Sequence, residues 1–128
     1  MQGKFQGRAV LSALAGVLLA TVALTATQAA AKRGGELFEK RCTGCHALDT
    51  IKAGPLLRGV FSRLSASDPR FPYSDALKKA KITWDTAALD RWLMNPDAVA
   101  PDNDMSFRLD SAEERAAIIA FLKELSGK

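Results

Sequence analysis

An all-α domain with unusually long loops is the fold that the sequence predicts, and three observations support it. Apolar residues recur at helical spacing in the stretches 34–46, 83–95 and 110–128. No run of alternating β-branched residues indicates a strand. The segments 47–73 and 95–107 show no sustained period and are rich in glycine, proline or aspartate. Loops this long in a small domain need a bound group to fold around.

The first two predicted helices have recognisable limits. The first follows a glycine pair and places Leu37 and Phe38 on a face that the two cysteines continue. The second has Thr83 or Asp85 as its N-cap, and Pro96 stops it because proline cannot extend a helix. Both helices therefore present a short apolar face to a common core.

The third helix, near the C-terminus, has the clearest pattern. Ser111 and Glu114 form a capping box, in which each side chain is expected to bond the backbone N–H of the other residue. Its apolar face consists of Ile118, Phe121, Leu122 and Leu125. A short helix is also expected at residues 74–80. The predicted domain thus has three main helices and a short one.

The N-terminal segment has the features of a secretory signal peptide. Lys4 and Arg8 give a positive start, residues 9–25 form an uncharged apolar run, and small residues permit cleavage after Ala29 or Ala31. The alternative is that the segment stays on as a membrane anchor, although 17 residues is at the low end for a bilayer-spanning helix. We expect cleavage and export to the periplasm.

Residues 1–31 are therefore predicted to be a leader, and residues 32–128 a single small domain. Without Lys4 and Arg8, the domain has 16 basic and 14 acidic side chains, a net charge of +2. The domain has no clustered basic stripe, which argues against a nucleic-acid partner. Export leads to an oxidising compartment, in which two free cysteines normally form a disulfide.

Both cysteines and the only histidine of the chain lie in the segment KRCTGCHALDT, residues 40–50. Cys42, Cys45 and His46 fit three kinds of site: a redox dithiol, a metal site or a covalent haem anchor. A thioredoxin-like dithiol belongs to an α/β fold, and this sequence offers no βαβ pattern. A structural zinc site needs four ligands, so carboxylates would have to complete the set.

The spacing Cys-x-x-Cys-His is the attachment signature of c-type haem. Three residues advance about 300° around a helix, so Cys42 and Cys45 lie on nearly one face and reach the two vinyl groups of one porphyrin edge. His46 can then turn its imidazole to the iron. Together with the leader and the loop-rich helical pattern, this favours one covalently bound haem c per chain.

A second axial ligand must come from elsewhere in the chain. The chain has no other histidine, and methionine is the next common axial partner. Met94 lies in the predicted helix 83–95, where packing explains it. Met105 lies in the loop APDNDMSF, where no helical packing requires a methionine. Met105 is therefore the favoured ligand.

Beyond these residues, the sequence resembles class I cytochrome c, and in particular the mitochondrial and bacterial c2 types. The resemblance runs from Gly34 to Leu125. It rests on motifs in the family's order: GELFEKRCTGCH, AGPLLRGVFSR, FPYSDALKKAKITW, WLMNP and ERAAIIAFLK. Met105 stands nine residues after Pro96, which is the spacing of the family's methionine ligand. The resemblance implies the class I cytochrome c fold around one haem.

The resemblance also implies roles for individual residues. The carbonyl of Pro55 would accept the ring N–H of His46, which fixes the imidazole tautomer. Gly34 and Phe38 would pack the first helix against the last. The residues expected beside the haem propionates or the exposed haem edge are Arg63, Tyr73, Trp84 and Phe107.

Several positions depart from the family's pattern. Trp92 is expected to line the haem pocket, but it stands where the family usually has tyrosine, so a hydroxyl near the methionine sulfur is missing. Leu77 replaces a usual asparagine, Asn103 a usual threonine and Ser62 a glycine. The loop after the haem-attachment motif is a few residues short. These departures bear on the redox potential more than on the fold.

With histidine and methionine both bound, the iron has no open position for a substrate. The resemblance therefore implies a one-electron carrier, not an enzyme, in a periplasmic respiratory or related redox chain. Its partners would be redox proteins such as membrane-bound complexes, and the chain would act as a monomer that touches a membrane only through an uncleaved leader. The alternative is a haem peroxidase or small-gas-binding protein, which requires that Met105 does not bind iron.

Acidic residues outnumber basic ones around the expected methionine loop. Residues 84–114 contain eight acidic and two basic side chains, and Asp97, Asp102 and Asp104 flank Met105. Either this face is only solvated, or it docks a partner that is not strongly acidic.

Overall fold

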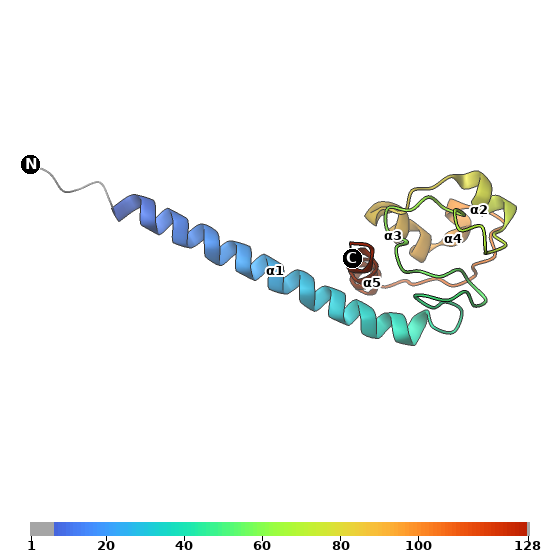
Figure 1. Ribbon diagram of the computed structural model, residues 1–128, viewed down its shortest axis with the longest axis horizontal. Coiled ribbons are helices and arrows are strands. Elements are labelled where there is room, and N and C mark those ends of the chain that lie inside the picture. The colour runs from blue at the N-terminus through green and yellow to red at the C-terminus, as the bar shows by residue number, and fades with distance from the viewer. Residues whose placement is uncertain (1–6, 128) are drawn as a thin grey trace, which may run out of the picture.

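The computed structural model describes the backbone of residues 7–127 and the side chains of residues 24–127. Its helices are α1 (Gly7–Arg41), α2 (Asp75–Ala80), α3 (Thr86–Met94), α4 (Pro96–Val99) and α5 (Ala112–Ser126). The other elements gather around the C-terminal end of the long α1 (Figure 1). Over the described residues the only β-type pairing is an isolated bridge between Leu64 and Thr83. The all-α prediction is confirmed.

Helix α1 differs from the first predicted helix at both ends. It begins at Gly7, and it ends at Arg41, before the Cys-x-x-Cys-His motif. The motif occupies the turn that follows, in which the backbone N–H groups of Cys45 and His46 both donate to the carbonyl of Cys42, at 3.1 and 2.8 Å. The prediction that the cysteines lie inside the helix was wrong, but this turn keeps the histidine one helical turn beyond Cys42.

The predicted leader falls largely outside the described side chains. Lys4 lies outside the described residues, and nothing is described of the side chains of Arg8 or of most of the run 9–25. Over the part of the chain that the structure describes, no helix has the length and hydropathy needed to cross a membrane. The boundary between residues 31 and 32 stays a prediction.

The ends of α2 and α3 follow the sequence signals. The Asp85 carboxylate accepts the N–H of Ala88 at 2.7 Å, and Ser74 caps α2 in the same way. Pro96 ends α3 as expected, but it also starts α4, where an irregular segment was predicted. Proline fits there because the first helical position needs no N–H donor.

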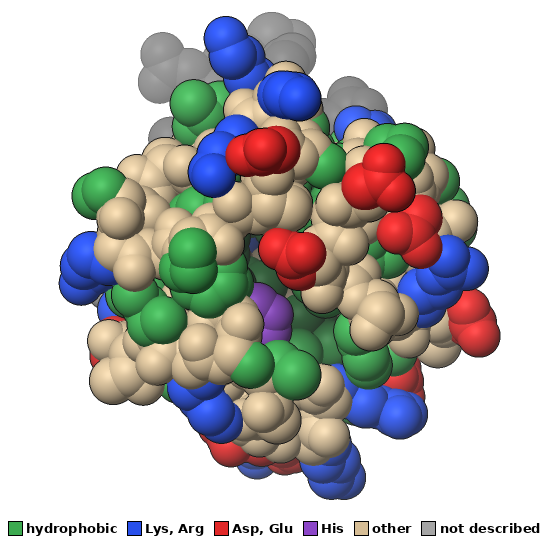
Figure 2. Space-filling view, turned by 90° about the vertical axis from the view of Figure 1, so that its right-hand side faces the viewer, with side chains coloured by type: hydrophobic (Ala, Val, Ile, Leu, Met, Phe, Trp, Pro, Cys, Tyr) green, Lys and Arg blue, Asp and Glu red, His purple; other side chains and the backbone are tan. Residues whose placement is uncertain are grey.

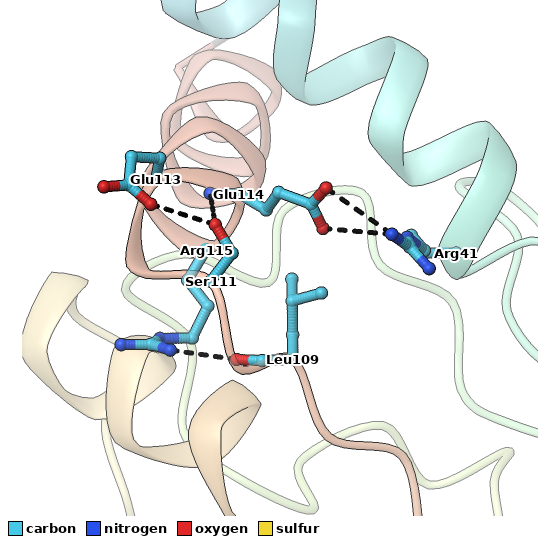
Figure 3. Close-up of polar contacts among 6 residues, drawn as sticks. All are labelled: Arg41, Leu109, Ser111, Glu113, Glu114 and Arg115. Atoms are coloured by element: carbon cyan, nitrogen blue, oxygen red, sulfur yellow. Dashed lines mark hydrogen bonds and ion pairs between the residues drawn. The ribbon is translucent and has the colours of Figure 1, made fainter.

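The cap of α5 is half of the expected capping box. The Ser111 hydroxyl accepts the N–H of Glu114 at 3.2 Å, as predicted. The Glu114 carboxylate does not return to Ser111; it approaches the Arg41 guanidinium at 3.4 and 3.5 Å and so ties α5 to the end of α1 (Figure 3). Behind the cap, the buried Arg115 donates to the Leu109 carbonyl at 2.9 Å (Figure 3). It also donates to the Asp90 carboxylate at 2.7 Å.

Helices α1 and α5 cross at a glycine. A β-carbon on Gly34 would stand 1.9 Å from the Ala117 carbonyl oxygen, so only glycine allows this approach. One turn further along α1, the Phe38 ring packs on Phe121 with ring centroids 5.5 Å apart. Phe38 and Ile118 are each only 1 % exposed. This crossing fixes the end of α1, and with it the start of the cysteine motif.

Ser62 occupies a backbone conformation that favours glycine, with φ of 66°. Its N–H donates to the Trp84 carbonyl at 2.9 Å, so the turn is pinned beside the core. We expect Ser62→Gly to raise the free energy of unfolding by about 0.5–1 kcal/mol, because the relieved strain exceeds the extra chain entropy of glycine. Guanidinium unfolding measures this change. The control Ser67→Gly, at a residue without positive φ, should be neutral or destabilising; equal effects of both substitutions would contradict the explanation.

Candidate functional site

All the residues predicted for the site line one cavity of about 280 Å³. Figure 2 looks into its opening, with the histidine side chain visible inside and apolar side chains around the rim. The predicted residues that line it are Cys42, Cys45, His46, Pro55, Arg63, Tyr73, Trp84, Trp92, Met105 and Phe107. They come from the turn that follows α1, from α3 and from the long loops between the helices.

The other residues that line the cavity are mostly apolar, and they were not among those predicted for the site. They include side chains of α2, α3 and α5 and of the loop 56–74, chiefly Leu57, Val60, Leu64, Phe71, Leu77, Leu89, Leu93, Ile118 and Leu122. The helical members belong to the apolar faces that the sequence pattern revealed, so periodicity was the available signal. An enclosed space of this composition suits a large apolar ligand.

The two cysteines lie at the edge of this cavity. Cys42 is half-buried, Cys45 is exposed, and no disulfide joins them. Burial raises the pKa of the Cys42 thiol to about 11. A redox dithiol needs a nucleophilic cysteine with a lowered pKa, so this environment argues against the dithiol interpretation.

The His46 imidazole is fixed by its neighbours. Its Nδ1 lies 2.8 Å from the Pro55 carbonyl oxygen, so Nδ1 carries the proton and donates, and Nε2 is left with its lone pair. Burial lowers the pKa of His46; the Pro55 bond acts in the opposite sense, and the nearby charge of Lys52 lowers the pKa further. The histidine is therefore held as a neutral imidazole, the form that binds metals.

Gly54 makes room for this imidazole. A β-carbon at Gly54 would stand 2.3 Å from Cε1 and 2.6 Å from Nδ1 of His46, so no larger residue fits while the ring keeps its place. Gly54 was not among the residues predicted for the site, although its position directly before Pro55 was the available signal. The glycine and the proline carbonyl together determine where Nε2 points.

We expect Gly54→Ala to displace the His46 ring and to lower the yield of haem-bearing protein. The methyl group must overlap the ring or push the loop away, which costs about 1–3 kcal/mol of stability. The haem content per milligram of purified protein and the guanidinium midpoint measure the effect. Gly127→Ala is the matched control, because a β-carbon there meets only the Glu124 carbonyl oxygen, at 3.9 Å, and lies outside the haem-attachment motif. Normal haem content in Gly54→Ala would contradict this role.

Met105 lies on the loop after α4, and two side chains hold it. The Asn103 Oδ1 accepts the Met105 N–H at 2.7 Å, while the Asn103 amide donates to the Ala100 carbonyl at 2.9 Å. The Trp92 indole Nε1 donates to the Met105 sulfur at 3.1 Å. The other candidate, Met94, is 47 % exposed and does not line the cavity.

Several polar side chains line another part of the cavity wall. The Arg63 guanidinium donates to the Leu56 carbonyl at 3.1 Å. Tyr73 and Trp84 are buried, and burial raises the pKa of the Tyr73 phenol. Near them, Asp68 is buried and accepts hydrogen bonds from Arg70, which lower the pKa of this carboxyl to about 2. Arg63, Tyr73 and Trp84 supply hydrogen-bond donors suited to buried carboxylates.

The zinc interpretation finds no support in the geometry. Among the described residues, no three histidine, cysteine, aspartate or glutamate side chains converge closely enough to hold a metal ion. Two cysteines at the mouth of an apolar cavity, a neutral histidine inside it and a methionine on its wall suit a planar, covalently attached macrocycle with a central metal. The fold and the site therefore define a c-type haem protein.

Comparison with known proteins agrees with this class. The cytochrome c family model matches residues 31–126, and the chain belongs to the cytochrome c family. It is 41 % identical over 96 residues to cytochrome c of Chlamydomonas reinhardtii, covering 72 % of this chain and 86 % of that protein. It is 42 % identical over 98 residues to cytochrome c2 of Rhodomicrobium vannielii, covering 73 % and 78 %.

A solved structure gives the same result. Cytochrome cH from Methylobacterium extorquens superposes with a TM-score of 0.70 at 34 % sequence identity, covering 73 % of this chain and 97 % of that one. The predicted class I cytochrome c fold is thereby confirmed. As in the rest of the family, the cofactor is covalent haem c and the function is electron transfer, and Cys42 and Cys45 fit the attachment motif.

Proposed function

We propose that this chain is a one-electron carrier whose haem iron is held by His46 and Met105. The observation that supports this most strongly is the position of the two side chains on the wall of a single cavity, although 59 residues separate them in the sequence. When bound, the haem iron supplies a ferric–ferrous couple. If both residues bind the iron, the protein would leave no position on it for a substrate, which suits a carrier and not an enzyme.

The chain's own residues would orient and enclose the group. Cys42 and Cys45 would each contribute a thioether link, and the Pro55 carbonyl would hold the Nδ1 proton of His46 so that Nε2 faces the iron. Arg63, Tyr73 and Trp84 would donate hydrogen bonds to the propionates. The apolar wall, with Trp92 and Phe107, would exclude water and so favour the ferrous state, which carries less charge.

We also propose that residues 1–31 are a leader that is removed on export and that the carrier works in the periplasm. The family match begins at residue 31, beside the small residues suited to cleavage, and this supports the boundary. Mass spectrometry of the protein purified from a periplasmic fraction would test it. A mature N-terminus at Lys32 or Ala30 is the expected result, whereas an intact Met1 in a membrane fraction would contradict the proposal.

The partners proposed for the carrier are redox proteins, among them membrane-bound complexes, that are not strongly acidic. Acidic side chains lie on one side of the cavity opening in Figure 2. Asp97 is neutralised by Arg108 at 2.8 Å, whereas Asp104 lines the cavity itself, and within the described structure neither Asp102 nor Asp104 has an ionic partner. Electron transfer to an oxidase with an acidic docking site should depend weakly on salt. A steep fall of the rate with ionic strength would contradict this charge pattern.

The test of the carrier function is electrochemical and spectroscopic. The purified protein should show a reversible one-electron couple and a ferrous spectrum that carbon monoxide does not change, because both axial positions are occupied. A ferrous protein that binds carbon monoxide rapidly, or a high-spin ferric spectrum, would favour the alternative of a peroxidase or a small-gas-binding protein. That alternative requires that Met105 leaves the iron open, and the contacts of Met105 with Trp92 and Asn103 weigh against it.

A further inference from the structure

Trp92 is a buried residue of α3, and the only polar atom of its side chain points at Met105. The indole Nε1 lies 3.1 Å from the Met105 sulfur. A tryptophan N–H can only donate, and a buried one normally finds an acceptor. The sequence comparison with the family suggested that a donor was lost at this position together with the tyrosine hydroxyl. In the structure the indole supplies a donor of its own.

The indole is held in this orientation by packing. Its ring stands edge-on to Trp84, with centroids 5.2 Å apart at an angle of 63°. The neighbouring Leu93 carbonyl accepts the N–H of Leu109 at 2.8 Å, which ties α3 to the segment after Met105. The backbone hydrogen bond between Leu93 and Leu109 therefore holds α3, which carries the Trp92 donor, close to the loop that carries the Met105 sulfur.

We infer that Trp92 positions and tunes the methionine ligand: its N–H donates to one lone pair of the Met105 sulfur and leaves the other for the iron. This inference rests on the proposed ligation by Met105. A thioether sulfur has two lone pairs, so it can accept an N–H and bind a metal at once. The hydrogen bond withdraws electron density from the sulfur, which weakens donation to ferric iron more than to ferrous iron, so it raises the reduction potential.

Asn103 complements this contact on the backbone side. Its side chain accepts the Met105 N–H and donates to the Ala100 carbonyl, and this fixes the main chain of the ligand loop. Trp92 then fixes the far end of the same residue, at the sulfur. Met105 is thus held by hydrogen bonds at its backbone N–H and at its sulfur, independently of any bond to iron. Trp92 is accordingly a positioning residue, which acts on the iron only through Met105.

The test compares three replacements of Trp92 in the haem-bearing protein. Trp92→Phe removes the donor, Trp92→Tyr restores one as a hydroxyl, and benzothienylalanine at position 92 keeps the shape but has sulfur in place of N–H. The readouts are the midpoint potential and the near-infrared sulfur-to-iron absorption band. We expect the phenylalanine and benzothienyl variants to shift the redox equilibrium about tenfold toward ferric iron, or about 59 mV for one electron. The tyrosine variant should recover most of this shift.

The controls separate the inference from the proposed function. Met94→Leu, two residues after Trp92 in the same helix but exposed, should leave the potential and the band unchanged. If the wild-type band is present and the benzothienyl variant keeps the wild-type potential, the inference is wrong while ligation by Met105 stands. If the wild-type protein has no such band, the proposed ligation fails and the inference fails with it.

Discussion

Replacing Met105 by alanine is expected to lower the reduction potential by a few tenths of a volt and to open the iron to carbon monoxide. Axial ligands set haem potentials over a range of roughly 0.8 V, so the loss of a thioether that favours ferrous iron is a large change. The cavity wall offers no substitute: the remaining methionine of the domain, Met94, is exposed and outside it. Potentiometry and a carbon monoxide titration of the ferrous protein measure the two effects.

Met94→Ala is the matched control for this substitution. It removes a thioether of the same size from the adjoining helix α3, where the side chain is 47 % exposed. We expect its potential and its indifference to carbon monoxide to equal those of the wild type. If Met94→Ala lowered the potential and Met105→Ala did not, the ligand assignment would be reversed.

Gly34→Ala is expected to destabilise the domain by about 3 kcal/mol or more, or to prevent recovery of the haem protein. The new methyl group would meet the Ala117 backbone oxygen at 1.9 Å and the Phe121 β-carbon at 2.8 Å. Because backbone atoms cannot turn aside as a flexible side chain does, α1 and α5 must separate. Their separation would also loosen Phe38 and move the cysteine motif at the end of α1.

The same change elsewhere in the chain serves as the control. Gly127→Ala adds a methyl group at the end of α5, where the nearest atom is the Glu124 carbonyl oxygen at 3.9 Å. Guanidinium unfolding of the haem-bearing proteins should give a wild-type midpoint for Gly127→Ala and a much lower one for Gly34→Ala. Midpoints within experimental error of each other would show that the helix crossing tolerates a larger residue.

The helices could be predicted largely because their ends carry local signals. Asp85 and Ser111 accept the N–H groups of their own helices, and such contacts depend on a few neighbouring residues. The contacts that could not be predicted involve residues far apart in the sequence. Glu114 leaves the expected capping box because Arg41, 73 residues away, offers a charged partner. The short helix that begins at Pro96 was missed because four residues carry almost no periodicity.

Site residues could be predicted where haem attachment requires a fixed sequence spacing. They were harder to predict where their role depends on side-chain packing. The Cys-x-x-Cys-His motif and the loop methionine could be read directly, and all predicted site residues line one cavity. Gly54 was missed because its role is the absence of a side chain beside His46. The replacement of tyrosine by Trp92 was read as a lost donor, since only the structure shows that the indole reaches the sulfur.

Binding of the haem iron by both His46 and Met105 can be checked by proton NMR of the reduced protein. A methionine bound over the porphyrin face feels its ring current, so one S-methyl resonance should be shifted far upfield of the ordinary methyl region. We expect the shifted resonance to persist in Met94→Leu and to disappear in Met105→Leu. A reduced wild-type protein without a shifted S-methyl, or one whose shifted resonance survives in Met105→Leu, would contradict it.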